Sequence, residues 1–374
     1  MSRAFLDKVT HFAKGRVAPE AAAWSIGAAP EPALYQEAAA LGLLGMELPK
    51  ARGGQGVDFA TRVAACEIMA GADFGFAMSL VNTHNIALRL CEEGQVAAVE
   101  QPLAALLSGQ MHACTALTEP GTGSDFAAIR TTARQVDGGW LLDGEKSWII
   151  NGRQAGLAVV YAQCAEIGDS SGIGAFVVDL TVPGVTRYAI DSAFAQTSLG
   201  TGGFHLDGVK LPQEAMISAS GTAFKAILQE INAARTYVAA MCDGMLQAAL
   251  DSAAAYGAQR LSFGKPLNQI PRWHAEFDAA ERALTQARDV TRHAVAQVSQ
   301  GADAQLAAAE AKIGSVTCAQ THLPRLLQLM GAEGLRPEHP FTRHIAAAQI
   351  AGFTDGATNI LKDRVARLTA RKET

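Results

Sequence analysis

The chain has 374 residues, 49% of them apolar and 18% charged, which is enough for two or three structural units around a sizeable core. Its net charge of −5 and its lack of a long basic run argue against nucleic-acid binding, because phosphate contacts need a concentrated cationic surface. No apolar run approaches the roughly 20 residues that a membrane helix needs, and no signal-peptide core opens the chain. We therefore expect no membrane insertion and a cytoplasmic location.

The cysteines and histidines give no sign of a metal site. The six cysteines are widely scattered, no CxxC pair occurs, and the histidines show no HExxH spacing. We therefore expect free thiols and no metal. The cysteines are Cys66, Cys91, Cys114, Cys164, Cys242 and Cys318.

Residues 1–112 are predicted to form an N-terminal α-helical domain. Apolar residues recur at helical spacing in 31–46 and 62–78, and both stretches are rich in alanine and leucine. The loop 48–58, LPKARGGQGVD, separates them. Its glycines are expected to make turns, since no strand-to-helix unit surrounds them as in a phosphate-binding loop.

Residues 113–218 change to a period of two and predict a central antiparallel β-barrel or sandwich domain. Within 138–152, GGWLLDGEKSWIING, the Asp143-Gly144 pair predicts a hairpin turn between two strands. A second Asp-Gly pair, Asp207-Gly208, lies in 204–212. Further strands are expected in 155–164, 173–181 and 184–190.

Residues 219–374 return to helical spacing and predict a C-terminal domain of the four-helix-bundle type. Val238, Met241, Met245 and Ala249 step by three and four, which marks one apolar stripe for core packing. The order helical, β, helical defines an α+β fold. Two helical layers flanking a β unit would leave a crevice for a large flat ligand.

One carboxylate, Asp355, lies in a small loop near the C-terminus, AGFTDGATNI (351–360). The loop separates two alanine-rich helical runs. From local pattern alone, Asp355 either caps the following helix or is a catalytic base presented by a bend.

Four stretches together resemble the acyl-CoA dehydrogenase family. The first is 116–152, with Thr118-Glu119-Pro120, Gly123-Ser124-Asp125 and the run from Gly144 to Gly152. The others are RLSFGKPL (260–267), QLMGAEG (328–334) and the loop around Asp355. Their order and separations fit the family across nearly the whole chain, and so does the α–β–α texture.

This resemblance implies an FAD cofactor and assigns residues to it. Leu117 (main chain) and Thr118 serve the flavin ring, Ser124 and its amide serve the pyrophosphate, and Trp148 packs on the isoalloxazine. A second set contacts the FAD of a neighbouring subunit, where an arginine suits a pyrophosphate. The complete cofactor set is Leu117, Thr118, Gly123, Ser124, Trp148, Ile150, Arg260, Ser262, Phe263, Gln328, Gly331 and Asn359.

The resemblance also implies the reaction and its partners. Asp355 takes the α-proton of an acyl-CoA or carrier-protein thioester, and the β-hydride passes to flavin N5. Electrons then leave to an electron-transfer flavoprotein, and the assembly is a dimer or tetramer of identical chains or a hetero-oligomer with a paralogue. The implied substrate contacts are Asn82, Thr83, Ser124, Arg235, Val238 and Thr354. The polar run Asn82–His84 indicates a polar, short or cyclic acyl group, or else only a polar turn at a helix N-terminus.

Several positions depart from the family pattern. Ile150 replaces the Thr or Ser whose hydroxyl reaches flavin N5, and Pro271 replaces the usual glutamine. Ala346-Ala347 replace an Arg-Asp pair, and Asp355 stands where most members have glutamate. The alternative base position of a second subset is occupied by Ala234, so Asp355 is the remaining candidate base.

Three functions follow from this comparison. The first is an FAD-dependent acyl-thioester dehydrogenase. The second keeps the flavin but changes the chemistry to an oxidase or a non-oxidative elimination, which the apolar Ile150 would suit. The third is a non-catalytic subunit that completes the FAD sites of a paralogue.

Overall fold

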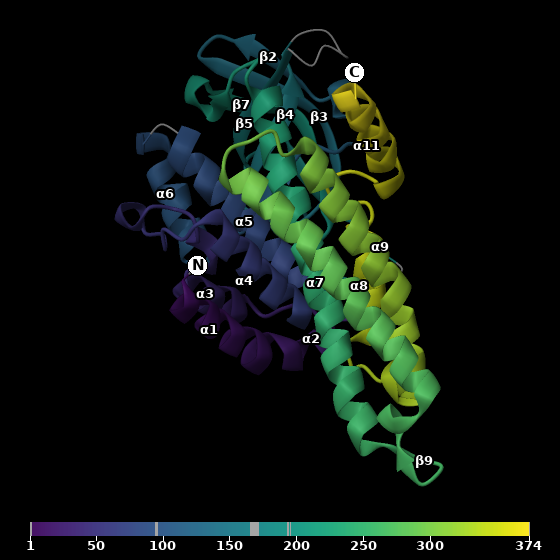
Figure 1. Ribbon diagram of the computed structural model, residues 1–374. Helices are drawn as coiled ribbons and strands as arrows, with labels where there is room; N and C mark the ends of the chain where they lie inside the picture. The colour runs from purple at the N-terminus through teal and green to yellow at the C-terminus, as the bar shows by residue number, and fades with distance from the viewer. Residues whose placement is uncertain (1, 94–95, 165–171, 193, 195, 374) are drawn as a thin grey trace.

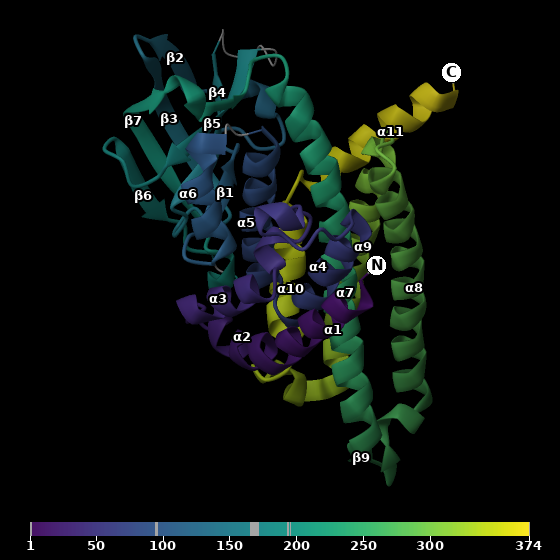
Figure 2. The same ribbon diagram turned by 90° about the vertical axis from the view of Figure 1, so that its left-hand side faces the viewer.

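The computed structural model describes residues 2–93, 96–164, 172–192, 194 and 196–373, and it divides into a helical body and a β-sheet unit (Figure 1). The sheet lies at one end of the molecule. A small hairpin, β9 (Leu261–Ser262) and β10 (Lys265–Pro266), marks the opposite end (Figure 2). The predicted α+β architecture with helical first and last segments is confirmed. In the described residues, no helix is long and apolar enough to cross a membrane.

The first helical segment starts two of its longer helices with aspartate caps. Asp58 Oδ1 accepts a hydrogen bond from the Thr61 amide, and Asp73 Oδ1 accepts one from the Phe76 amide, both at 2.7 Å. The loop 48–58 contains only a short 3₁₀ turn, Lys50–Arg52, as predicted. The helices are α1 (Arg3–Phe12), α2 (Ala18–Trp24), α3 (Pro32–Ala40), α4 (Phe59–Ala72), α5 (Phe74–Glu93) and α6 (Val96–Leu107), and a π-helical turn, Ala13–Val17, joins α1 to α2.

The β unit is one mixed sheet in the order β6-β7-β3-β2-β4-β5-β8, with β1 also paired to β4. Most pairs are antiparallel, but β1 and β2 pair with β4 in parallel, which the prediction of an antiparallel domain missed. Long crossover connections allow these pairings. The strands are β1 (Ala113–Ala116), β2 (Thr132–Val136), β3 (Gly139–Ile149), β4 (Leu157–Gln163), β5 (Ile173–Asp179), β6 (Val185–Ala189), β7 (Gly202–Pro212) and β8 (Met216–Ser218).

The predicted hairpin turn at Asp143-Gly144 is wrong, because β3 runs through it without turning back. The second Asp-Gly pair also lies inside a strand, β7, directly across from the first. Asp143 Oδ1 accepts a hydrogen bond from the Gly208 amide at 2.8 Å, and the register shifts there by a bulge. Gly144 has a φ of +150°, and a Cβ on it would lie 2.6 Å from Thr131 Oγ1. The glycine therefore serves a bulge.

The C-terminal segment is built on one very long helix, α7 (Ala223–Gln259), whose 37 residues span about 55 Å. The later helices are α8 (Pro271–Ser299), α9 (Gln305–Met330), α10 (Phe341–Ala351) and α11 (Thr358–Glu373). The proposed domain boundaries fall in the connections between α6 and β1 and between β8 and α7.

The two helical segments share one hydrophobic core, so they do not flank the sheet as separate layers. Buried residues of α1–α5 and of α7–α10 form a single cluster, while the sheet has a core of its own. Helices α4 and α7 approach so closely that a Cβ on Gly244 would lie 2.1 Å from the Glu67 carbonyl oxygen. The predicted arrangement of two separate helical layers around the sheet is therefore wrong, and the crevice for a flat ligand stays a prediction.

A carboxyl group is buried inside this helical body. The side chain of Asp243 on α7 is 1% exposed, and its Oδ2 accepts a hydrogen bond from Thr291 Oγ1 at 2.8 Å. Its Oδ1 has no partner in the described structure. Burial raises the pKa of Asp243 to about 7, and the bonds from Thr291 and Ser315 offset only part of this rise.

We predict that Asp243→Asn changes how stability depends on pH. In the wild type, the folded state keeps the Asp243 proton up to about pH 7, whereas the unfolded chain loses it near the ordinary pKa of 3.8. Stability is therefore lost as pH rises through this window, at about 1.4 kcal/mol per unit. Denaturant unfolding at pH 5 and pH 8 should show the variant gaining about 2–3 kcal/mol on the wild type.

The matched control is Asp251→Asn, an exposed aspartate on the same helix. Its unfolding free energy should follow the wild type at both pH values. Parallel pH dependence of Asp243→Asn and wild type would show that Asp243 is ionised throughout.

Candidate active site

Asp355 lies at the tip of a closed loop between α10 and α11. The Thr358 amide and hydroxyl both donate to the Gly352 carbonyl, at 2.9 and 3.0 Å, and so join the ends of the loop. Asp355 has a φ of +53°, which is uncommon for a residue other than glycine. Its side chain is half-buried. The loop therefore presents the Asp355 carboxyl on a strained backbone.

Arg235 on α7 holds this loop from one side. Its guanidinium is buried, Nε donates to the Asp355 carbonyl at 3.0 Å, and Nη1 donates to Asn232 Oδ1 at 3.0 Å. The predicted neighbourhood of Arg235 and Asp355 is therefore present. The contact is to the backbone, so the Asp355 carboxylate is left free of this bond.

Lys312 on α9 holds the loop from the other side. Its Nζ donates to the Gly352 carbonyl at 3.0 Å, the Gly356 carbonyl at 2.8 Å and Thr358 Oγ1 at 3.3 Å. Sequence reasoning missed this residue. The signal was present, because helical spacing places Lys312 on the same buried face of α9 as Ala308 and Ser315.

Burial raises the pKa of Asp355 to about 6, and the positive charges of Arg235 and Lys312 limit the rise. The charge of Asp355 also contributes to the raised pKa values of two groups on α7. Burial and the charge of Asp355 raise the pKa of the Tyr237 phenol. Burial raises the pKa of Glu230 as well, with Arg89 opposing the rise and Asp355 adding to it. Asp355 is thus mainly ionised at neutral pH but close to its titration range, which suits a general base.

The predicted flavin-ring residues lie at two neighbouring strand ends. Leu117 and Thr118 directly follow β1, and Trp148 and Ile150 lie at the end of β3. The Ser147 amide donates to the Thr118 carbonyl at 3.0 Å, so these segments are adjacent. Gly123 and Ser124 follow in an exposed loop. The structure therefore brings these six predicted residues to one rim of the sheet.

A buried ion pair fixes the two strand ends against each other. Lys146 Nζ lies 2.8 Å from Glu119 Oε1 and donates to the Leu117 carbonyl at 3.1 Å. Glu119 also accepts hydrogen bonds from the amides of Arg130 and Thr131. Burial lowers the pKa of Lys146 to about 8, and Glu119 opposes that fall. The motif residues Glu119 and Lys146 thus hold the backbone segments of this rim together through buried bonds.

Helix α5 connects the rim to the loop that carries Asp355. The buried Asn151, at φ +64°, donates to the carbonyls of Ser79 and Ala113 at 2.9 and 3.0 Å. Two turns along α5, Asn85 Nδ2 donates to the Tyr237 hydroxyl at 3.2 Å. Helix α5 therefore bonds the end of β3 through Asn151 and α7 through Tyr237, whose phenol pKa is raised in part by the charge of Asp355.

The polar run Asn82–His84 lies in the middle of α5, so its interpretation as an N-terminal helix turn is wrong. His84 is fully buried beside Glu47, and Thr83 Oγ1 accepts from the Ala113 amide at 3.3 Å. Val238 is fully buried in the shared core, and Thr354 Oγ1 donates to the Ile350 carbonyl at 3.1 Å. Contact of these side chains with substrate stays a prediction, and the structure gives most of them an internal role.

The second predicted cofactor set lies at the opposite end of the molecule. Arg260 follows Arg235 by 25 residues on α7, which is about 37 Å along the helix axis. Ser262 and Phe263 lie at the β9–β10 hairpin (Figure 1), and Phe263 is 95% exposed. Gln328 and Gly331 lie at the same end, where Trp273 Nε1 donates to the Leu329 carbonyl at 3.2 Å. Within one chain, these residues do not join the Asp355 site.

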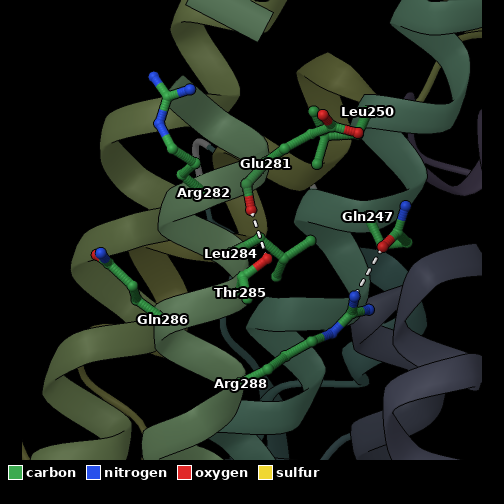
Figure 3. A pocket seen from close by; sticks show the side chains of 8 residues that line it. All are labelled: Gln247, Leu250, Glu281, Arg282, Leu284, Thr285, Gln286 and Arg288. Carbon is green, nitrogen blue, oxygen red and sulfur yellow. Dashed lines mark hydrogen bonds between the residues drawn. The ribbon is translucent and has the colours of Figure 1, made fainter. Parts of the chain in front are cut away.

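A surface pocket of about 530 Å³ lies between α7 and α8, away from Asp355 (Figure 3). Arg288 at its edge donates to Gln247 Oε1 at 2.8 Å and to Glu67 Oε1 at 2.6 Å. Gln247 is 12 residues, about 18 Å, along α7 from Arg235. None of the predicted site residues lines this pocket.

Comparison with known proteins agrees with this geometry. Three family models match in order: acyl-CoA dehydrogenase N-terminal domain (2–110), middle domain (114–209) and C-terminal domain (221–369). The human mitochondrial short-chain specific acyl-CoA dehydrogenase is 32% identical over 324 residues, covering 86% of this chain and 78% of that protein. Benzylmalonyl-CoA dehydrogenase of Aromatoleum aromaticum is 28% identical over 371 residues, covering 98% and 97%.

Solved structures show the same similarity. Butyryl-CoA dehydrogenase from Megasphaera elsdenii superposes with a TM-score of 0.92 at 28% identity, covering 98% of this chain and 97% of that one. A Mycobacterium smegmatis glutaryl-CoA dehydrogenase in complex with FADH2 gives a TM-score of 0.91 at 25% identity, covering 98% and 94%. Fold and site therefore define a three-part flavoprotein dehydrogenase. The chain belongs to the acyl-CoA dehydrogenase family, whose members are FAD-dependent enzymes of acyl-CoA metabolism.

We predict that Glu119→Gln destabilises the protein by about 3–5 kcal/mol, because it leaves the Lys146 ammonium buried without its counter-charge. Urea unfolding of the purified variant measures this loss. The matched control is Glu214→Gln on the exposed surface of the same β unit, which should leave the midpoint unchanged. Equal unfolding midpoints for Glu119→Gln and wild type would show that the Lys146–Glu119 ion pair does not stabilise the sheet rim.

Proposed function

We propose that this chain is an FAD-dependent acyl-thioester dehydrogenase in which Asp355 removes the α-proton. The observation that carries the proposal is the Asp355 loop itself. It holds a half-buried carboxyl with a pKa near 6, tied through its backbone to two buried cations. A carboxylate with these properties can accept a proton from a carbon acid at neutral pH.

The sheet rim fits a large flat aromatic group. Trp148 has a φ of +58° and is 59% exposed, although burying an indole would be favourable. Leu117 and Thr118 offer main-chain and hydroxyl groups beside it, and Ser124 lies in the exposed loop that follows. We assign these residues to FAD. Bound FAD supplies the hydride acceptor at N5.

In this mechanism, the Asp355 carboxylate takes the α-proton while the Asp355 amide donates a hydrogen bond to the thioester carbonyl. Aspartate is one methylene shorter than the glutamate usual in the family. The left-handed backbone at Asp355 and the tether from Arg235 therefore decide where the carboxylate points. Positioning of this kind matters because a misplacement of about 1 Å can cost roughly 10²-fold in rate.

We infer a short acyl group as the substrate. Arg62 is buried, donates to Glu47 and Asn85, and lies 5.0 Å from the centre of the Tyr237 ring. This buried cluster links α4, α5 and α7 through Arg62, Asn85 and Tyr237, and the charge of Asp355 contributes to the raised pKa of the Tyr237 phenol. Short-chain specific relatives among the most similar proteins support the same conclusion. Either coenzyme A or a carrier protein would present the thioester.

The exposed set at the far end of α7 supports an assembly. We propose that Arg260, Ser262, Phe263, Gln328 and Gly331 contact the FAD of a neighbouring subunit in a dimer or tetramer, since one chain keeps them far from its own rim. Asn359, exposed at the start of α11, is assigned to FAD as well. The electron acceptor in this scheme is an electron-transfer flavoprotein.

One observation favours a second candidate. Ile150 packs against the helical core, at a position where the family usually has a hydroxyl near flavin N5. The alternative is therefore an oxidase or a non-oxidative elimination. Anaerobic photoreduction followed by air separates the two redox outcomes. Fast reoxidation with peroxide release would identify an oxidase, and slow reoxidation a dehydrogenase.

We predict that Asp355→Asn slows the bleaching of bound flavin by butyryl-CoA roughly 10²- to 10⁴-fold, because the general base is lost. Stopped-flow absorbance at the flavin band measures this step. In the wild type, the same rate should rise with pH through about 6, as Asp355 ionises, and then level off. Asp363→Asn, an exposed aspartate on α11, is the matched control and should bleach at the wild-type rate. Bleaching by Asp355→Asn at full rate would refute the base assignment.

We also predict that Trp148→Ala weakens FAD binding by about 1 kcal/mol or more while leaving the apoprotein as stable as wild type, because the indole is exposed without its ligand. Titration of apoprotein with FAD, followed by flavin fluorescence, gives the affinity. Thermal unfolding of the apoprotein gives the stability. Wild-type affinity in the variant would place the flavin away from this rim.

A further inference from the structure

The amine of Lys312 occupies the centre of the loop that carries Asp355. The side chain is fully buried, and its three acceptors, the carbonyls of Gly352 and Gly356 and the hydroxyl of Thr358, all belong to the turn between α10 and α11. These acceptors lie on both sides of Asp355 in the sequence. One ammonium group therefore spans the loop from the end of α10 to the start of α11.

We propose that Lys312 is a positioning residue, which holds the Asp355 loop through these bonds and supplies a positive charge that favours the ionised Asp355 carboxylate. The inference rests on the proposed role of Asp355 as the base. It deepens that role by assigning both the geometry and the charge of the site to a residue on a different helix, α9.

The chemistry of the contacts supports this assignment. The hydrogen-bond partners of Lys312 are neutral oxygens, so no contacting carboxylate among the described residues cancels its charge. A buried ammonium is costly unless its surroundings compensate it. The end of α10 contributes, because the last carbonyls of a helix carry partial negative charge. Burial lowers the pKa of Lys312 to about 8, and the carboxylate of Asp355 opposes that fall.

Two helices clamp the loop between them. Arg235 on α7 bonds the carbonyl of Asp355, while Lys312 on α9 bonds the carbonyls on either side of it. The other ionisable groups that bear on this centre among the described residues are Glu230, Tyr237 and Cys242 on α7 and Arg364 on α11. Of the cations, Lys312 is the one whose bonds span the whole loop.

Two substitutions separate the hydrogen bonds from the charge. Lys312→Gln removes the charge but leaves an amide that can donate to a loop carbonyl. Lys312→Met removes both while keeping the length of the side chain. The pH dependence of flavin bleaching by butyryl-CoA reports the ionisation of Asp355. Hydrogen–deuterium exchange of the peptide that contains 352–358, measured by mass spectrometry, reports how firmly the loop is held without reference to catalysis.

For Lys312→Gln, we expect the midpoint of the pH–rate curve to move upward by roughly one pH unit, because a nearby cation that favoured the carboxylate is lost. Lys312→Met should show the same shift, a plateau rate at least about tenfold lower, and faster amide exchange in the loop. The matched control is Lys225→Gln, an exposed lysine on α7, which should leave the midpoint, plateau and exchange as in the wild type.

A folded Lys312→Gln protein with an unchanged midpoint overturns the inference. If neither lysine variant folds, Thr358→Val tests the positional part, because it removes one acceptor of Lys312 and one bond to Gly352. Unchanged loop exchange and plateau rate in Thr358→Val would then overturn it. Asp355→Asn is measured alongside. Full-rate flavin bleaching by Asp355→Asn would refute the proposed function. Slow bleaching by Asp355→Asn together with an unchanged pH–rate midpoint in Lys312→Gln would refute only the role of Lys312.

Discussion

A cation buried in an apolar interior must find acceptors, and this chain takes them from the backbone of its functional loops. Lys146 bonds the Leu117 carbonyl beside its ion pair with Glu119, and Arg235 bonds the Asp355 carbonyl. Lys312 bonds two carbonyls of the same loop. Each cation ties an irregular segment to a regular element. The hydrogen bonds that offset the desolvation penalty of the charge also fix the geometry of that segment.

The shared helical core determines how these segments meet. Helices α4 and α5 of the first segment pack with α7 of the last in one cluster, although more than 100 residues separate them in sequence. Helix α5 bonds the sheet rim through Asn151 and α7 through Tyr237. One helix therefore helps to position both the sheet rim and the helix that holds the Asp355 loop. The site is thus assembled from three regions of the chain by packing that forms only in the complete fold.

Periodicity predicted the helical and β regions well, since a helix or strand repeats its pattern over many residues. The Asp-Gly pairs misled because a turn signal is local, whereas the bulge at Gly144 depends on a partner strand some 60 residues away. The predicted separate helical layers were wrong for the same reason: no local pattern shows that α4 and α7 share a core. Asp355 was assigned as the candidate base through motif resemblance, and its role stays a prediction. Lys312 was missed because one lysine among alanines does not show that its partners lie 40 residues on.

Helix α7 carries residues for two different proposed sites along one continuous helix. Arg235, in the first half of α7, bonds the carbonyl of the proposed base Asp355, whereas Arg260, directly after the last residue of the helix, lies at a different position. In an assembly where that position is a neighbour's cofactor, two chains damaged at opposite ends of α7 can restore one another. Mixed assemblies of such chains would contain intact centres that neither parent possesses, which is the behaviour geneticists describe as interallelic complementation.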